Sequence, residues 1–287
     1  MLHDRNTLSD NEEWAVTIKT FTQSIKAFIN KANEFSPDNS NNIIIFEIND
    51  QTCTLAISDA MNCSAILTTF DIDIDLNDKI KGKFLLNDSI IERVNAASKG
   101  QFVITIKSQQ DLSEITFKQE TEKDGIYKNA TAEIQPLVDD NIPTLDEFDE
   151  KSEFEITPAF FLSLTAVESL YTQIATTGSE AIGFALKDTP TDPTGYEIEK
   201  TTIQNTTRSN GSPGGPSQYS SDLISEVARI FADKKNIMVK FTHNKPLILE
   251  GKYLTGIIAP RTSTNNQPMP TEAFGIDFSN FGEGTES

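Results

Sequence analysis

The feature that most constrains this chain is an order of segments that occurs twice. In each half, a strand-like run leads into a helix, several strands follow, and a second helix precedes the last strands. Apolar residues recur every third or fourth position in the helical segments, which begin near Thr22, Asn87, Pro158 and Ser221. A chain of 287 residues has room for two domains, each with its own core.

The strand-like runs alternate apolar and polar residues and follow one another closely. We predict strands at residues 14–21, 42–48, 53–58, 64–74, 101–108, 113–120, about 128–137, 154–156, 181–187, 195–203, 236–242, 246–251 and 253–260. Tight connections are expected at 49–50 and 59–62, and the third helix is expected to reach about residue 174. Short connections favour antiparallel pairing. The predicted class is α+β, with two antiparallel-sheet domains that each carry two helices on one face.

Composition marks the expected domain boundaries. Residues 139–155 hold eight acids, one lysine and Pro143, which is typical of an extended, solvated linker. We therefore expect domain 1 at 1–138, an acidic linker at 139–152, domain 2 at 153–262 and a flexible tail at 263–287. The Gly/Pro/Ser-rich segment 208–218 is expected to be a flexible loop.

The charge balance excludes several functions. Acids outnumber bases 43 to 24, so a basic protein that coats DNA is excluded, and an anionic membrane surface is not an expected partner. No apolar run is long enough to cross a bilayer, and the N-terminal segment has no apolar leader. We expect a cytoplasmic protein, at the nucleoid or replication site, that is not secreted.

The sequence offers little for catalysis or for metal binding. His243 is the one histidine outside the N-terminal segment, and it falls where a strand is expected to end. The acids from Asp71 to Asp75 alternate as in a strand and lack the glycine and glutamate of a calcium loop. Cys53 and Cys63 form neither a disulfide framework nor a Cys-x-x-Cys site. We expect no enzyme activity, no metal and no cofactor.

Three segments resemble the DNA polymerase sliding clamps. KPLILEGKYLTGIIAPR (245–261) is similar to the clamp C-terminus, IPTLDEFDEKSEFEI (142–156) to the linker that enters the second domain, and LAISDAMNCSAILTTF (55–70) to a first-domain hairpin. Together with the order of segments, the likeness spans about residues 14–261. It implies the duplicated DNA-clamp fold, assembled as a six-domain ring. A two-domain chain would form such a ring as a homotrimer.

The resemblance also implies a function. A sliding clamp encircles double-stranded DNA without reading its sequence and tethers a DNA polymerase and other partners for processive replication. Partners dock through short clamp-binding peptides, and a clamp loader is a further candidate partner. The alternative is an oligomeric scaffold of a virus-type assembly that does not encircle DNA. The oligomeric state and retention on circular DNA distinguish the two.

Two sets of site residues follow from the resemblance. The DNA-facing set holds bases on or beside three of the four helices: Lys19, Lys26, Lys31, Arg93, Lys99, Arg229, Lys234 and Lys235. The partner-peptide groove holds small and apolar residues of the hairpin, the linker and the final strands: Ser58, Met61, Cys63, Ile142, Leu145, Pro246, Ile257, Ala259 and Pro260.

Both sets have a plainer explanation. Bases on a soluble helix are often only a solvated face, and the apolar residues could belong to an ordinary interdomain core. The aromatic residues of the tail segment 274–281 raise a further hypothesis, that the tail occupies a groove and regulates access to it. The competing interpretation is that the tail is disordered and does not bind a groove.

Overall fold

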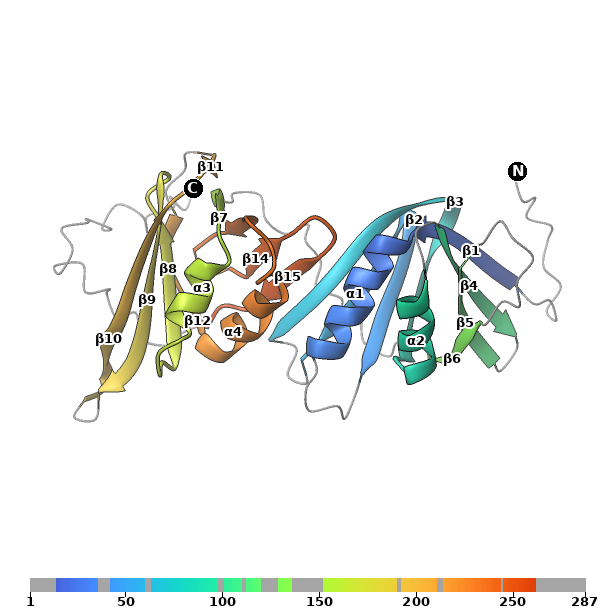
Figure 1. The fold of residues 1–287 in the computed structure, drawn as a ribbon, viewed down its shortest axis with the longest axis horizontal. Coiled ribbons are helices and arrows are strands. Elements are labelled where there is room, and N and C mark those ends of the chain that lie inside the picture. The colour runs from blue at the N-terminus through green and yellow to red at the C-terminus, as the bar shows by residue number, and fades with distance from the viewer. Residues whose placement is uncertain are drawn as a thin grey trace, which may run out of the picture. The chain divides into compact units, whose positions relative to one another are not determined.

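The computed structural model describes residues 14–35, 42–59, 63–97, 101–109, 112–119, 129–135, 152–189, 192–210, 214–243 and 245–261. The chain divides into two compact units (Figure 1). Unit 1 comprises Met1–Ile57 and Leu67–Ile142, and unit 2 comprises Ser58–Ile66 and Pro143–Ser287. The tip of the hairpin between the second and third strands therefore belongs to unit 2, although its two strands run into unit 1.

Unit 1 is built on a mainly antiparallel sheet. Its elements are β1 (Trp14–Phe21), α1 (Thr22–Phe35), β2 (Ile43–Ser58), β3 (Ser64–Leu85), α2 (Asp88–Ala96), β4 (Gln101–Gln109), β5 (Leu112–Gln119) and β6 (Ala130–Gln135). The strand order is β1-β4-β5-β6-β3, and β2 pairs with β3. The pairs β1–β4, β4–β5, β5–β6 and β3–β6 are all antiparallel.

Unit 2 repeats the plan with its strands divided between two ladders. Its elements are β7 (Ser152–Ile156), α3 (Ala159–Leu164), β8 (Tyr171–Thr176), β9 (Glu180–Thr189), β10 (Asp192–Asn205), β11 (Arg208–Ser209), β12 (Gly214–Ser220), α4 (Ser221–Ile230), β13 (Ile237–Phe241), β14 (Leu247–Glu250) and β15 (Thr255–Ile258). One ladder runs β10-β9-β8-β12, and the other runs β15-β14-β13-β7-β11.

The cores lie between the sheets and the helices. Figure 1 shows α1 and α2 together against the strands of unit 1, and α3 and α4 likewise in unit 2. In unit 1, the rings of Phe46, Phe84, Phe117 and Phe102 follow one another with centroids 5.7–6.4 Å apart, and all four are buried. Such aromatic contacts add to the stability gained by burying the rings.

Two glycines bring the helices of unit 2 close to the sheets. A Cβ at Gly183 of β9 would collide with the Leu164 side chain of α3, and a Cβ at Gly256 of β15 would collide with Val227 of α4. Because neither position has room for a side chain, each glycine sets how near the helix can approach. Figure 1 shows α3 and α4 lying next to these strands.

The α+β class and most predicted elements are confirmed, whereas the tight connection at 49–50 is wrong. β2 runs unbroken through Asn49 and Asp50, and β3 continues past the expected end at residue 74 to Leu85. Polar turn residues do not end these strands because their backbones stay paired along a long β2–β3 ladder.

The third helix is much shorter than predicted. It ends at Leu164, and the next segment is strand β8, which pairs with β9 and β12. β8 contains the β-branched residues Thr172, Ile174 and Thr176, which are buried and which favour strands. Spacing of apolar residues could not separate a helix from this strand because both patterns fit so short a run.

The predicted flexible loop at 208–218 is also wrong in part. Arg208–Ser209 forms β11, and Gly214–Ser220 forms β12, which pairs with β8. β12 lies at an outer position of its ladder, where Pro216 is tolerated because an edge strand has one unpaired side.

The predicted domain boundaries remain predictions. Most of the linker 139–152 and the whole tail 263–287 lie outside the described residues.

Candidate nucleic-acid face and peptide interface

Lys26, the first of the two basic residues on α1, is engaged within unit 1. Lys26 Nζ donates hydrogen bonds to the carbonyl oxygens of Asn95 (2.8 Å) and Ala97 (3.1 Å). These carbonyls lie at the C-terminal end of α2, where the last turn of a helix lacks backbone donors. A cation there also interacts favourably with the helix dipole. Lys26 therefore holds α1 against α2 and does not stand as an isolated charge.

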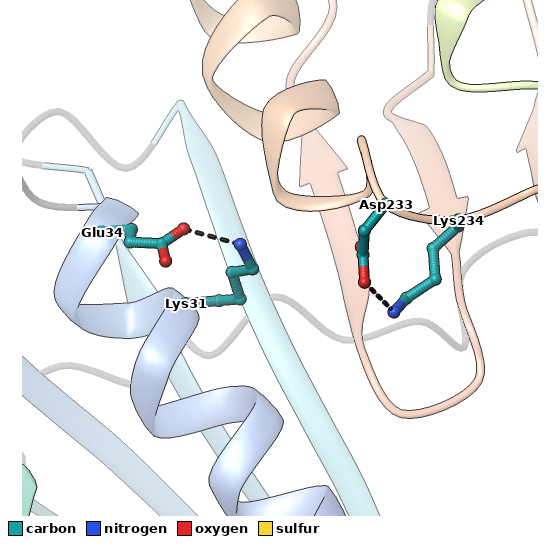
Figure 2. Close-up of polar contacts among 4 residues, drawn as sticks. All are labelled: Lys31, Glu34, Asp233 and Lys234. Carbon is teal, nitrogen blue, oxygen red and sulfur yellow. Dashed lines mark hydrogen bonds and ion pairs between the residues drawn. The ribbon is translucent and has the colours of Figure 1, made fainter. Parts of the chain in front are cut away.

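Two other predicted DNA-facing lysines form ion pairs with nearby acids (Figure 2). Lys31 Nζ lies 2.7 Å from Glu34 Oε2 on α1, and Lys234 Nζ lies 2.7 Å from Asp233 Oδ2 after α4. The Glu34 and Asp233 side chains are more than half exposed, so each pair adds little to stability. Each pair does reduce the positive charge that its lysine presents.

The remaining members of the DNA-facing set differ in their placement. Arg229 lies in the last turn of α4 and is exposed. Lys235 is exposed too, but like Lys234 it lies beyond Ile230, where α4 ends. Arg93 is half-buried on α2. The backbone of Lys19, in β1, pairs with that of Val103 in β4. Lys99 lies outside the described residues.

Acids offset the bases on every helix that carries charge. α2 combines Arg93 with Asp88 and Glu92, and α4 combines Arg229 with Asp222 and Glu226. α3 has no charged residue, so no described helix has a net charge above that of a single base. A helical face this close to neutral can make only a small number of strong phosphate contacts.

The predicted peptide groove brings together residues from distant parts of the sequence. The backbone N–H of Ala259 donates a 2.8 Å hydrogen bond to the carbonyl oxygen of Cys63. Pro246 directly precedes Leu247, which pairs with Ile258, so Pro246 and Ala259 lie at the same end of the β14–β15 ladder. The hairpin tip and the final strands therefore meet within unit 2.

The degree of burial varies among the other groove residues. Ile257 is buried, whereas Ser58, Cys63, Pro246, Ala259 and Pro260 are half-buried. Half-buried apolar residues retain surface that a partner could cover. Met61, Ile142 and Leu145 lie outside the described residues, so their place in the groove remains a prediction.

Asp59 shapes the hairpin tip that carries Cys63. Its Oδ1 atom accepts hydrogen bonds from the backbone N–H groups of Cys63 (2.6 Å) and Ser64 (2.8 Å), and its own N–H donates to the Ser64 carbonyl (3.0 Å). Bonds of this kind to an ionised acceptor are the stronger class of hydrogen bond. Asp59 belongs to the segment 55–70 that resembles a clamp hairpin, but no sequence pattern indicated this structural role.

The contacts that fix the end of the final strand were not predicted from the sequence either. The guanidinium carbon of Arg261 lies 3.7 Å from the centroid of the Tyr171 ring, and its backbone N–H donates to Gln218 O. The Tyr219 hydroxyl donates to the Lys245 carbonyl at 3.0 Å, and burial raises the pKa of that hydroxyl. The Arg261–Tyr171 stack is a cation–π contact, and no local sequence signal marks such a pair.

His243 lies where the sequence places it, just after β13, and it is exposed. Its Nδ1–H donates to the carbonyl of Pro216 at 2.7 Å. Within the described ranges, no group of three or more His, Cys, Asp or Glu side chains could hold a metal ion. None of the described helices is long and apolar enough to cross a membrane.

Two units, each with antiparallel strands and a pair of helices, define the duplicated clamp fold. No protein-family model matches the sequence, and none of the curated proteins matches it either. Solved structures do match: the PCNA2–PCNA3 complex from Sulfolobus tokodaii is 14% identical, with a TM-score of 0.55, over 86% of this chain and 99% of the matched chain.

Two further clamps match over similar lengths. PCNA of A. fulgidus, in a structure with the C-terminal region of FEN-1 bound, is 11% identical with a TM-score of 0.57, over 87% of this chain and 99% of its own. Proliferating Cellular Nuclear Antigen from Entamoeba histolytica is 13% identical with a TM-score of 0.55, over 86% and 98%. The chain has the fold of the PCNA sliding clamps.

Proposed function

We propose that this chain is a DNA sliding clamp, a non-enzymatic ring that encircles duplex DNA and tethers a polymerase at the replication site. The observation that carries the proposal is the extent of the fold match. The likeness covers 98–99% of each clamp chain and not a single shared domain. Fold likeness alone does not fix a function, so the proposal also rests on the assembly and on the interface.

The proposed assembly is a homotrimer. β10 pairs with β9 alone among the described strands and runs for 14 residues, so it presents a long sheet edge. Ile203 on this strand is 52% exposed. Long edges with exposed apolar residues tend to pair with another chain. A ring that continues the sheet from one subunit to the next would cover this edge.

The proposed partner site is the surface where the hairpin tip meets the final strands. FEN-1 contributes its C-terminal region to the complex with A. fulgidus PCNA, which is a precedent for peptide docking on this fold. In this chain, the half-buried Cys63, Pro246 and Ala259 would provide apolar contacts for such a peptide. A DNA polymerase and a clamp loader are the partners that we expect to use it.

Two measurements test the proposal. Light scattering coupled to size exclusion should give a mass near three times the 31.8 kDa of the chain. The purified ring should then remain on circular or end-blocked DNA and leave a linear duplex through its free ends. A trimer that is not retained on closed DNA would instead favour the scaffold function, and a monomer would contradict both functions.

A further inference from the structure

The bases on the helices of this chain are not equivalent. Lys26 is hydrogen-bonded to two carbonyl oxygens, Lys31 is paired with Glu34, and Lys234 is paired with Asp233. Figure 2 shows the two ion pairs, each formed between neighbours on one segment. A phosphate that approached any of these lysines would have to compete with a partner that is already in place.

Arg229 and Lys235 differ from the other bases. Both are exposed, and neither has a hydrogen bond or an ion pair with any residue of the described ranges. They flank the C-terminal end of α4, in the last turn and just after it. The carbonyl oxygens of Ala228 and Arg229 already accept hydrogen bonds, from the N–H groups of Phe231 and Ala232. The guanidinium and ammonium groups are therefore not needed to cap the helix.

From these contacts we infer that, among the helix bases whose side chains the structure describes, the phosphate contacts are concentrated at the C-terminal end of α4, on Arg229 and Lys235. This inference rests on the proposed function, because it assumes that the helices face a duplex. A ring of three copies would then touch the DNA backbone at three separate points. Lys26 would serve mainly to hold α1 against α2.

A ring with few phosphate contacts has a measurable signature. The logarithm of the DNA-binding constant falls with the logarithm of salt concentration, with a slope of about −0.9 for each phosphate neutralised. We therefore expect a shallow salt dependence, and a ring held on closed DNA by its topology even at salt concentrations that abolish binding to a short open duplex. Sliding would meet little resistance because few contacts must break at each step.

The test compares two double variants of the full chain that remove the same charge. R229Q/K235Q removes the two exposed bases at the C-terminal end of α4, and K31Q/K234Q removes two lysines that are paired with acids. Binding to a fluorescent open duplex is measured by anisotropy across a salt titration. We expect R229Q/K235Q to weaken binding at least tenfold at low salt and to flatten the slope by about 0.9 per lost contact. K31Q/K234Q should change the binding constant less than threefold and leave the slope unchanged.

The result that overturns the inference is an equal change in both variants, or no change in R229Q/K235Q, while the wild-type ring still binds. Failure of the proposed function gives a different result, because the wild-type protein itself would then not be retained on closed DNA. Thermal unfolding and light scattering show whether each variant is folded and assembled. Single variants at Arg229 and Lys235 provide a second measurement if the double variant assembles poorly.

Discussion

The carbonyl oxygen of Cys63 accepts a hydrogen bond from the backbone N–H of Ala259 at 2.8 Å. This bond ties the tip of the β2–β3 hairpin to the chain that leaves β15, and both segments belong to unit 2. The proposed peptide groove therefore depends on a turn that comes from the first half of the sequence. The stability of this turn should depend on the residue that holds it together.

That residue is Asp59, whose carboxylate accepts hydrogen bonds from two backbone N–H groups. We expect Asp59→Ala to lower the free energy of unfolding by about 1–3 kcal/mol, because it leaves both donors without their acceptor. It should also make the Cys63 thiol react faster with a thiol reagent, as the tip loosens. Asp59→Asn is the matched control, since it retains one acceptor oxygen. Equal thiol reactivity in both variants would contradict this role.

The Lys26 contacts give a second prediction. Lys26→Met should lower the free energy of unfolding by about 1–2 kcal/mol, because the Asn95 and Ala97 carbonyls lose a charged donor. Lys31→Met should change it by less than about 0.5 kcal/mol, since its partner Glu34 is well exposed. Urea unfolding measures both. A larger loss in the Lys31 variant would show that Lys26 does not hold α1 against α2.

The starts of helices α1, α2 and α4 were the most predictable part of the fold. α2 begins where the sequence indicates, with Asn87 Oδ1 accepting from the N–H of Ile90 at 2.9 Å. Helix caps are local, so a few neighbouring residues are enough to identify them. Strand β8 was not predictable in the same way. Its residues become a strand because β9 and β12 lie on either side, and those partners are distant in the sequence.

The proximity of two groove residues was predictable, whereas the contacts of the charged residues were not. The resemblance placed Cys63 and Ala259 in one groove, and the structure brings them into contact. Helical position alone made Lys26 and Arg229 equal candidates for DNA contact. They differ because Lys26 meets carbonyl groups of another helix, whereas Arg229 has no such neighbour among the described residues. Partners of this kind are set by packing, which the sequence does not display.

The buried thiol of Cys53 predicts a pH dependence. Burial raises the pKa of this thiol far above its usual value, so it stays neutral in the folded protein. An unfolded cysteine ionises near pH 8.5. Above about pH 8.5, the unfolded state therefore releases a proton that the folded state keeps, and stability falls as pH rises. Below that pH the thiol has no such effect.

The measurement is the free energy of unfolding of wild type and Cys53→Ala between neutral pH and about pH 10, under reducing conditions. Below about pH 8 the difference between the two proteins should be constant and should reflect the lost packing of the side chain. Above about pH 8.5 the wild type should lose stability relative to the variant by up to about 1.4 kcal/mol per pH unit. Parallel profiles across the whole range would contradict the prediction.

The edge strand β10 gives a prediction about assembly. Ile203→Asp places a charge on the exposed edge, and we expect it to convert the trimer to monomer because a buried interface would have to desolvate the carboxylate. Leu170→Asp is the control, since Leu170 is similarly exposed at 51% but lies in the segment between α3 and β8. Light scattering measures both variants. Loss of the trimer in the Leu170 variant alone would place the interface elsewhere.

The contact between β15 and α4 gives the last prediction. A Cβ at Gly256 would collide with Val227 Cγ1 and would also come within 3.2 Å of the Phe231 ring. Gly256→Ala should therefore lower the free energy of unfolding by about 1–3 kcal/mol, as overpacked cores do. Val227→Ala alone should also destabilise, because Val227 is fully buried and its loss leaves a cavity.

Together the two substitutions should partly cancel, since the smaller residue at 227 makes room for the new methyl group at 256. We expect the double variant to be more stable than the sum of the single effects predicts, by about 1 kcal/mol or more in a double-mutant cycle. Urea unfolding of the four proteins measures this coupling. Additive losses would show that the backbone of β15, and not the Val227 side chain, sets how closely α4 approaches the sheet.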